Sequence, residues 1–205
     1  MPTALVTGAS RGIGAATAAH LVGQGWKVVG ASRSTGHDLT VPGTLRDLLA
    51  RVSPDAVVCC AGAVDPVAVR FALPDVWERA WRLHVGQAVE ALQWALSTPR
   101  FQGPVVLFGS TAGIRPSPGW AAYSVSKAAV HNLGITAAVE GAPDGKRVYT
   151  LAPGRCATAL RATLAPDEDP DDIMQPAEVA GVVWTCITDE AGVLAGQIIE
   201  VARRG

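Results

Sequence analysis

The sequence predicts the α/β class, a parallel β-sheet covered by helices, from three observations. Short apolar runs alternate with amphipathic stretches from the first residues onward, as helices that cross between parallel strands require. A glycine-rich turn at residues 8–14 joins the first apolar run to the first amphipathic stretch. The chain has 205 residues without an internal repeat, so we expect one domain that buries its own core.

Strands are expected where short apolar runs are bounded by turn residues. They fall at residues 4–6, 27–31, 55–60, 104–109, 147–151 and 197–201. The run at 55–60 is continuously apolar, which is typical of a strand buried on both faces. Helices are expected where apolar residues recur near every 3.6 positions, at residues 14–23, 44–52, 76–97, 123–139 and 177–187.

Two segments depart from this alternation. Residues 32–41 contain turn residues only, which leaves no room for a full helix there. Residues 161–176 hold five acidic side chains and three prolines without periodicity. This second segment is interpreted as a mobile surface loop that covers a substrate site, with a solvated connection as the alternative.

The composition excludes several kinds of partner. With 17 basic and 18 acidic side chains the net charge is −1, so we expect no nucleic acid and no membrane surface as a partner. No apolar stretch reaches the roughly 18 residues of a membrane span. No basic leader precedes the first strand, so a cytoplasmic protein is expected. The cysteines lack metal-ligand spacing, so we expect core residues and no metal at Cys59, Cys60, Cys156 and Cys186.

The turn after the first strand is a candidate phosphate site. A helix follows the sequence Thr7-Gly8-Ala9-Ser10-Arg11-Gly12-Ile13-Gly14. Glycines let the backbone pass close to a pyrophosphate, and the N-terminus of the helix offers free N–H groups. The spacing differs from the G-x-G-x-x-G of the general dinucleotide fingerprint, so a tight turn that binds nothing is the alternative.

The end of the second strand bears on the choice of cofactor. NAD-binding folds usually place an acid about there, which holds the ribose 2′-hydroxyl, but this chain has Ser32 and Arg33. Arg33 and Arg11 offer planar donors that suit a 2′-phosphate. The sequence therefore favours NADP(H) over NAD(H). Asp38, the nearest carboxylate, keeps NAD(H) as an alternative, and Arg33 could also be an ordinary surface charge.

Tyr123 and Lys127 form a candidate acid–base pair. Four residues apart, they lie on one face of the predicted helix. A cation beside a phenol favours the phenolate, so we expect Lys127 to lower the pKa of Tyr123 from its ordinary value of ~10. Such a phenol can act as a general acid or base. The alternative is an exposed pair on a solvated face.

These motifs follow one another in an order that resembles the short-chain dehydrogenase/reductase family over essentially the whole chain. The resemblance lies in Thr-Gly-x-x-x-Gly-x-Gly at residues 7–14, Ala61-Gly62 after the buried strand, Ser110 thirteen residues before Tyr123, Lys127, Pro153-Gly154 and Thr158. The motif Ala195-Gly196-Gln197 before the last strand also fits. The combination is far more specific than any one of its members.

The resemblance implies a single Rossmann-type domain over residues 1–205, with a doubly wound sheet of about seven strands. It implies that Tyr123 protonates a substrate carbonyl oxygen while NADPH delivers hydride, that Ser110 hydrogen-bonds this oxygen, and that Lys127 lowers the pKa of Tyr123 and holds the nicotinamide ribose. A homodimer or homotetramer built through the two long helices is also implied. The implied cofactor contacts are Gly8, Ser10, Arg11, Gly12, Ile13, Gly14, Arg33, Asp38, Leu39, Cys60, Ala61, Gly62, Tyr123, Lys127, Pro153, Gly154 and Thr158.

Two residues depart from the family pattern. Cys60 stands where the family has an asparagine whose amide braces the sheet. His84 aligns with the catalytic asparagine that helps to hold a water in the proton path to the lysine. Because imidazole titrates near neutrality, His84 could relay a proton itself; it could also merely fill the space, or be misaligned.

The leading hypothesis is an NADPH-dependent oxidoreductase that reduces a ketone or aldehyde, or catalyses the reverse reaction, with Ser110, Tyr123 and Lys127 in the site. A second hypothesis keeps the fold for proton chemistry without net redox, as in a cyclase, epimerase or dehydratase. A third is a cofactor-binding protein without turnover. His84, Cys60 and the short loop at 161–176 keep these two alternatives open.

Overall fold

The strands form one parallel sheet in the order β2–β1–β3–β4–β5–β6 in the computed structural model, which describes residues 1–203. The chain reverses direction across the sheet between β1 and β3, so a crevice is expected at the carboxyl ends of these two strands. The strands are β1 (Thr3–Thr7), β2 (Lys27–Ala31), β3 (Ala56–Cys59), β4 (Pro104–Phe108), β5 (Arg147–Pro153) and β6 (Ile198–Val201).

The described chain therefore has the six strands that the apolar runs predict, one fewer than the approximate count of seven that the family resemblance implies. The reason lies after β2. Residues 32–43, which would have to supply a further strand and helix, instead hold a short 3₁₀ turn at Arg33–Thr35 and a bend. As a result β2 is an edge strand, and its residues are more exposed than those of β3 or β4, which are buried throughout.

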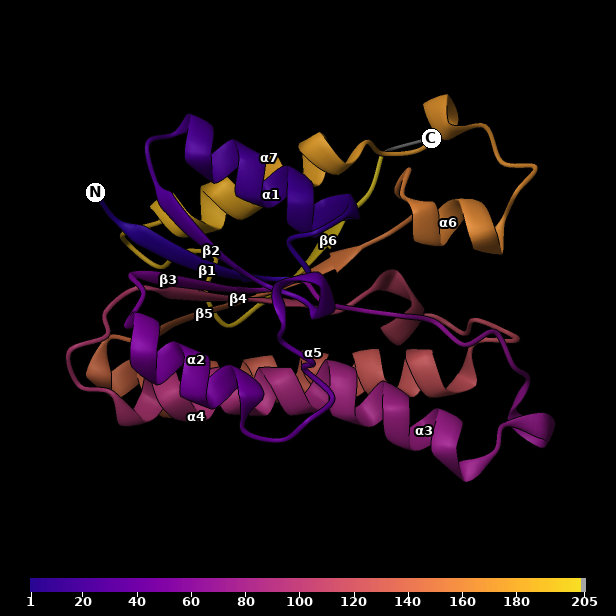
Figure 1. Ribbon diagram of the computed structural model, residues 1–205, viewed down its shortest axis with the longest axis horizontal. Coiled ribbons are helices and arrows are strands. Elements are labelled where there is room, and N and C mark those ends of the chain that lie inside the picture. Colours follow the sequence, from indigo (N-terminus) through magenta and orange to yellow (C-terminus); the bar gives the residue numbers. More distant parts are fainter. Residues whose placement is uncertain (204–205) are drawn as a thin grey trace.

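Helices cover both faces of the sheet (Figure 1). On one face α1 (Gly12–Gly23) packs against α7 (Pro176–Thr188). On the other face lie α2 (Thr44–Val52), α4 (Gln87–Ser97) and α5 (Ala121–Gly141). Each face has its own core, formed by alternate side chains of the central strands. The doubly wound architecture predicted from the sequence is confirmed.

The helix expected at residues 76–97 is continuous but changes its winding. It begins as α3 (Pro74–Ala80), continues as a π-helical segment (Trp81–Gly86) and ends as α4. A π turn accommodates an extra residue and shifts the faces of the helix that follows it. Here the segment holds the buried residues His84 and Val85, so the irregular winding coincides with a candidate site residue.

The segment at residues 161–176 has more structure than its composition suggests. Its first four residues belong to α6 (Ala159–Leu164), and a 3₁₀ turn forms at Pro170–Asp172. Ile173 and Met174 are buried, and Met174 forms a β-bridge with Cys156. The segment is thus attached to the core near its end, while its mobility stays a prediction.

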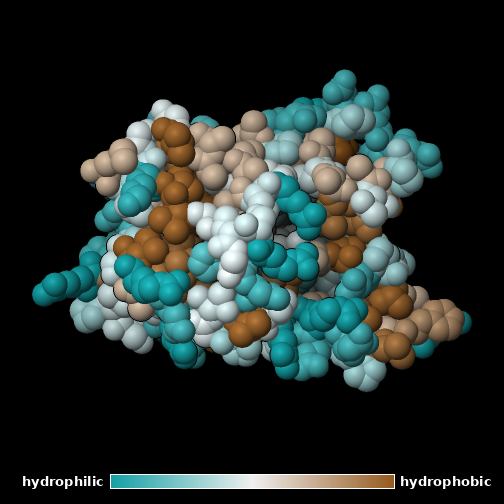
Figure 2. All heavy atoms as spheres, in the orientation of Figure 1, coloured by the Kyte–Doolittle hydropathy of each residue, from teal (hydrophilic) through white to brown (hydrophobic). Residues whose placement is uncertain are grey.

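The surface includes one exposed apolar tip. Before α3 a 3₁₀ turn at Val69–Phe71 leads the chain outward, and hydrophobic atoms gather at that end of the molecule (Figure 2). Val69, Phe71 and Leu73 are 71%, 69% and 65% exposed.

Among the described residues, no helix combines the length and apolar character that crossing a membrane demands. All four cysteines are free thiols, of which Cys59, Cys156 and Cys186 are buried in the core as expected.

Candidate active site

The predicted site residues gather at the carboxyl ends of the central strands. The glycine turn follows β1, Ala61 and Gly62 follow β3, and Ser110 follows β4. Pro153 ends β5, and Lys127 of α5 reaches the carbonyl of Phe108, the last residue of β4. Segments that are far apart in the sequence therefore contribute to a single region of the surface.

The glycine turn needs its glycines for both conformation and space. Gly8 and Gly12 have φ values of +67° and +56°, which side chains other than glycine rarely adopt. A Cβ on Gly8 would lie 2.8 Å from Cα of Ala61, and one on Gly14 would lie 2.3 Å from the carbonyl oxygen of Gly8. Among the described residues, no acidic side chain occupies the first turn of α1 and no side chain caps it. The free N–H groups and partial positive charge at the N-terminus of α1 can accordingly bind an anion.

Lys127 is buried beside β4 and Tyr123. Its Nζ donates to the carbonyl oxygen of Phe108 at 2.7 Å and lies 5.6 Å from the centroid of the Tyr123 ring. The predicted common helix face is thereby observed. Burial lowers the pKa of Lys127 to about 8.

The expected effect of Lys127 on Tyr123 is wrong for this structure. Burial raises the pKa of Tyr123 above its ordinary value, and a hydrogen bond from the Ser110 hydroxyl offsets part of the rise. Burial is the dominant cause, and it outweighs the effect that the spacing of Lys127 predicts. Tyr123 is therefore a protonated phenol at neutral pH.

Ser110 is held by its neighbours on both sides. It caps the 3₁₀ turn Thr111–Gly113, where its Oγ accepts from the N–H of Ala112 at 3.2 Å. Its own N–H donates to Nε2 of His131 at 3.2 Å. Its hydroxyl donates weakly to the carbonyl of Pro153 at 3.5 Å and also lies within hydrogen-bond reach of the Tyr123 phenol. A hydroxyl hydrogen can rotate between acceptors, so it can turn to a substrate oxygen placed beside Tyr123.

His84 is buried against α5. Its ring meets that of Tyr123 edge-on, with centroids 5.4 Å apart. Nε2 accepts from the N–H of Ala63 at 3.2 Å, and Nδ1 lies 2.8 Å from Oγ of Ser126, which itself donates to the carbonyl of Tyr123. An amide N–H can only donate, so the ring proton is on Nδ1 and the imidazole is neutral. Burial and the charge of Lys127 also hold the pKa of His84 well below its ordinary range.

Gln87 is a site residue that the sequence analysis does not single out. It is 2% exposed, and its amide Nε2 donates to the carbonyls of Ala61 and Leu83, both at 2.7 Å. Its Oε1 accepts from the Thr7 hydroxyl at 2.7 Å, and Thr7 Oγ1 accepts from the N–H of Ala61. This amide ties the end of β1 to the end of β3, which is the bracing that Cys60 cannot provide. One feature of the sequence could have pointed to Gln87: it is a polar residue at an inward-facing position of the predicted helix, three residues after His84.

The residues expected to contact the adenosine ribose, Arg11, Arg33 and Asp38, are exposed. Arg33 lies in the 3₁₀ turn after β2, and neither Arg33 nor Arg11 forms a salt bridge within residues 1–203. The carboxylate of Asp38 accepts from N and Oγ1 of Thr40, and these bonds, with a smaller contribution from Arg33, lower the pKa of Asp38. Leu39 is different, because it is buried in the hydrophobic core.

The segment after β5 lies close to the glycine turn and to Tyr123. Thr158, the N-cap of α6, has its Cγ2 3.3 Å from where a Cβ on Gly12 would lie. Arg161 places its guanidinium 6.0 Å from the Trp120 ring, whose centroid is 6.3 Å from that of Tyr123. Glu168 binds Arg161 through both carboxylate oxygens. The Trp120 ring beside Tyr123 is thus in contact with the guanidinium of Arg161, which is itself paired with Glu168.

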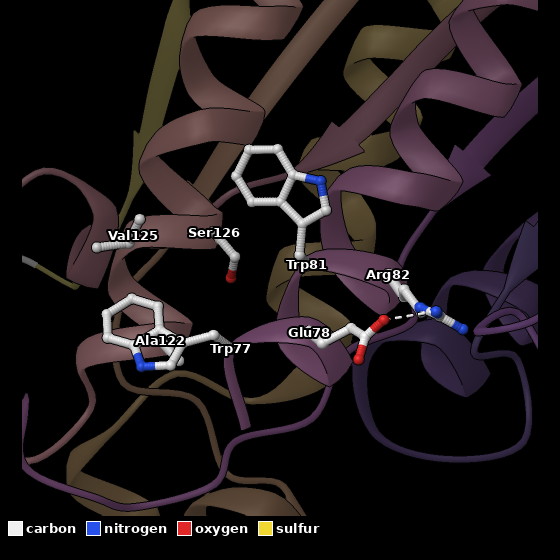
Figure 3. A pocket seen from close by; sticks show the side chains of 7 residues that line it. All are labelled: Trp77, Glu78, Trp81, Arg82, Ala122, Val125 and Ser126. Atoms are coloured by element: carbon white, nitrogen blue, oxygen red, sulfur yellow. Dashed lines mark hydrogen bonds and ion pairs between the residues drawn. The ribbon is translucent and has the colours of Figure 1, made fainter. Parts of the chain in front are cut away.

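A cavity of about 350 Å³ lies outside this region, between α3, the π-helical segment and α5 (Figure 3). The indoles of Trp77 and Trp81 stand on either side of it, and Glu78 and Arg82 form an ion pair at its margin. Ala122, Val125 and Ser126 of α5 complete the lining, which includes none of Ser110, Tyr123 and Lys127. This cavity is not the predicted cofactor crevice.

Comparisons with known proteins agree with this arrangement. The sequence model of the short chain dehydrogenase family matches residues 2–50 and 40–169. The chain is 30% identical to "Dehydrogenase/reductase SDR family member 4" from Homo sapiens, over 97% of this chain and 85% of that protein. It is 32% identical to a 3-oxoacyl-[acyl-carrier-protein] reductase from Synechocystis sp., over 97% of this chain and 94% of that protein.

A solved structure shows the same fold. The 3-oxoacyl (acyl-carrier-protein) reductase from Agrobacterium tumefaciens C58, with NADP bound, is 26% identical with a TM-score of 0.82, over 98% of this chain and 92% of that chain. The family match covers well over half of the sequence, and the motifs that carry it meet at one edge of the sheet. The chain therefore belongs to the short-chain dehydrogenase/reductase family of NAD(P)-dependent oxidoreductases.

Proposed function

We propose that this protein is an NADPH-dependent reductase of a ketone or aldehyde, able to run in reverse as an alcohol dehydrogenase. The observation that carries the proposal is the convergence of Ser110, Tyr123 and Lys127 next to the glycine turn. The tight turn that Gly8 and Gly14 allow against Ala61 and the turn's own backbone, together with the uncapped N-terminus of α1, suits a dinucleotide pyrophosphate. When bound, the reduced nicotinamide supplies hydride to the substrate carbonyl carbon.

Tyr123 is the proton donor of this mechanism. Its raised pKa keeps the phenol protonated at neutral pH, which suits reduction, because the forming alkoxide needs a proton. Ser110 donates its hydroxyl hydrogen to the same oxygen and stabilises its developing charge. Lys127, with a pKa of about 8, can hold a ribose hydroxyl and return a proton toward Tyr123. Oxidation of an alcohol needs the phenolate instead, so we expect that direction to gain rate as pH rises.

The preference for NADPH over NADH rests on Arg11 and Arg33. Both are exposed at the end of the crevice where the adenosine ribose is expected, and no acid replaces them at the tip of β2. Guanidinium groups bind phosphate through paired N–H donors. Asp38 is occupied by Thr40, which leaves it less free to accept from a ribose hydroxyl.

His84 acts in this proposal as a neutral support rather than as a relay. Both ring nitrogens are already bonded, Nε2 to Ala63 N–H and Nδ1 to Ser126 Oγ. Passing a proton through Nε2 would require release of the Ala63 contact. The chain from Nδ1 through Ser126 to the Tyr123 carbonyl instead fixes the backbone of Tyr123.

The proposed function is tested with purified protein, NADPH or NADH, and a panel of ketones and aldehydes. We expect loss of NADPH absorbance at 340 nm with at least one carbonyl, faster than with NADH. Cofactor binding by calorimetry without oxidation of NADPH would contradict the reductase. It would leave non-redox proton chemistry or a protein without turnover, which product analysis by mass spectrometry separates.

A homodimer or homotetramer is part of the same proposal. On the face formed by α3, the π-helical segment and α5, Trp81, Val125 and Val139 are 52%, 51% and 70% exposed. Apolar side chains exposed together on one helical layer favour association of copies. Light scattering of the purified protein should give a mass of two or four chains, and a monomer at micromolar concentration would contradict this part.

A further inference from the structure

His131 is a buried histidine for which the proposed mechanism has no role. It lies on α5, one turn beyond Lys127 and two turns beyond Tyr123, so the three side chains share a helix face. It is 4% exposed. A buried polar ring at this position needs partners, and its partner identifies what it does.

The partner is the backbone of Ser110. The N–H of Ser110 donates to Nε2 of His131 at 3.2 Å. Since an amide N–H cannot accept, Nε2 carries a lone pair, and the ring is neutral with its proton on Nδ1. A protonated ring would place an N–H of its own against the N–H of Ser110, so the contact exists only for the neutral imidazole.

The backbone around Ser110 is shaped to admit this ring. A Cβ on Gly109 would lie 1.9 Å from Nε2 of His131, and one on Gly113 would lie 3.0 Å from its Cε1. Glycines thus stand before and after Ser110, and the imidazole fills the space that they leave. The N–H of Gly109 donates to Leu151 on β5, so the far side of the same loop is also fixed.

The charges around His131 favour the neutral form. Burial is the main cause that lowers its pKa, and the ammonium of Lys127 on the same helix adds to it. Glu200 of β6 acts in the opposite direction, but its carboxylate is paired with Arg115 at 2.7 Å. At neutral pH the acceptor at Nε2 is therefore present.

We propose that His131 is the positioning residue for Ser110: its neutral imidazole fixes the Ser110 backbone so that the hydroxyl faces the phenol of Tyr123 and the substrate carbonyl. This inference rests on the proposed role of Ser110 in carbonyl reduction. It requires no contact between His131 and the substrate. Its effect is on the geometry of a hydrogen-bond donor, which acts on turnover more than on cofactor binding.

The first test uses NMR of the wild-type protein with ¹⁵N-labelled histidine. The chain has four histidines, so the ring signals of His20, His37, His84 and His131 can be resolved and assigned by single substitutions. We expect the Nδ1-protonated tautomer for His131, and acid titration below the ordinary histidine range that moves the amide signal of Ser110 in parallel. An Nε2-protonated tautomer, or a titration that leaves the Ser110 amide unmoved, overturns the proposal.

The second test compares variants with the NADPH-linked assay. His131→Leu removes the acceptor, and His131→Gln offers an amide oxygen at about the reach of Nε2. We expect kcat to fall about tenfold in His131→Leu, the equivalent of one hydrogen bond, and to recover within about threefold in His131→Gln. The Kd of NADPH should stay unchanged in both, and His20→Leu, on the opposite face of the sheet, should keep full activity.

Unchanged kcat in His131→Leu would overturn the proposal. Failure of the proposed function gives a different result. In that case none of the carbonyls in the panel would support oxidation of NADPH, even by the wild-type protein. The NMR experiment does not depend on turnover, so the tautomer and its coupling to the Ser110 amide decide the inference in either case.

Discussion

The ends of β3 and β4 and the end of β2 belong to the same crevice but are built differently. At β3 and β4 the polar side chains are buried and bond across long stretches of sequence: His84 with Ser126, Gln87 with Thr7, His131 with Ser110. Past the end of β2 the side chains of Arg33, Thr35 and Asp38 are exposed, and hydrogen bonds such as those of Thr35 and Asp38 reach no further than five residues.

This difference follows from what burial costs. A buried polar group without a partner costs about 1–3 kcal/mol, so the interior at β3 and β4 tolerates only one arrangement of these groups. The proposed catalytic groups are consequently in place before any ligand arrives. Exposed residues after β2 have water as an alternative partner, so they can change with little effect on the fold. We therefore expect chemistry to depend on the first region and cofactor choice on the second.

The largest expected effect is that of Tyr123→Phe, which removes the proposed proton donor. We expect kcat of NADPH oxidation with the best carbonyl of the panel to fall about 10³-fold, while NADPH still binds. The matched control is Tyr149→Phe on β5, whose hydroxyl donates to the carbonyl of Asp189. That variant should lose some stability and keep kcat, and a similar loss in both variants would contradict the assignment.

Gln87→Leu tests whether the buried network holds the strand ends. The substitution leaves the carbonyls of Ala61 and Leu83 and the Thr7 hydroxyl without their partner, so we expect the free energy of unfolding to fall by about 2–3 kcal/mol. Urea unfolding measures it. Gln102→Leu, an exposed glutamine, is the control and should change it by no more than about 0.5 kcal/mol. Equal values for the two variants would remove the bracing role of Gln87.

Gln87 also marks the limit of what the sequence could predict. The six strands, the glycine turn and the shared helix face of Tyr123 and Lys127 follow from local periodicity, and the structure confirms them. The bond of Gln87 with Thr7 and that of His131 with Ser110 join residues 80 and 21 positions apart, so no local pattern contains them. The π-helical winding at His84, in a segment that contacts α5, likewise has no signal in the local pattern.

The predicted lowering of the Tyr123 pKa was wrong for a related reason. Spacing places Lys127 on the correct face, but the pKa of Tyr123 is set mainly by burial, which depends on elements far away in the sequence. The seventh strand was an expectation of the resemblance alone, and the turn residues at 32–41 had already argued against the room for it. Local chemistry of this chain was the better guide there.

Arg33→Asp tests the exposed region. We expect the Kd of NADPH to rise about tenfold or more and that of NADH to change by less than about threefold, because only NADPH has the 2′-phosphate. Unfolding free energy should stay within about 0.5 kcal/mol of wild type, since Arg33 is exposed. Arg51→Asp, at the end of α2, controls for the change in net charge. Equal weakening of both cofactors would show that Arg33 does not read the phosphate.

The smallest expected effect is the dependence of stability on the charge of Lys127. Its pKa is about 8 in the folded chain against 10.5 for an ordinary lysine, so between these values the unfolded chain binds more protons than the folded one. Stability should therefore rise with pH in this window, by at most about 1.4 kcal/mol per pH unit. The buried thiols of Cys59 and Cys60, whose pKa values are raised, oppose the rise above about pH 9, where unfolded thiols ionise.

Lys127→Met isolates the lysine from these thiols, because both proteins contain them. Between pH 7.5 and 9 the wild type should gain about 1 kcal/mol of unfolding free energy relative to Lys127→Met. Lys27→Met, at an exposed position of β2, is the matched control and should follow the wild-type curve. Parallel curves for wild type and Lys127→Met would mean that the ammonium is not held in a dry environment. The contrast between the buried and the exposed end of the crevice would then lose its electrostatic basis.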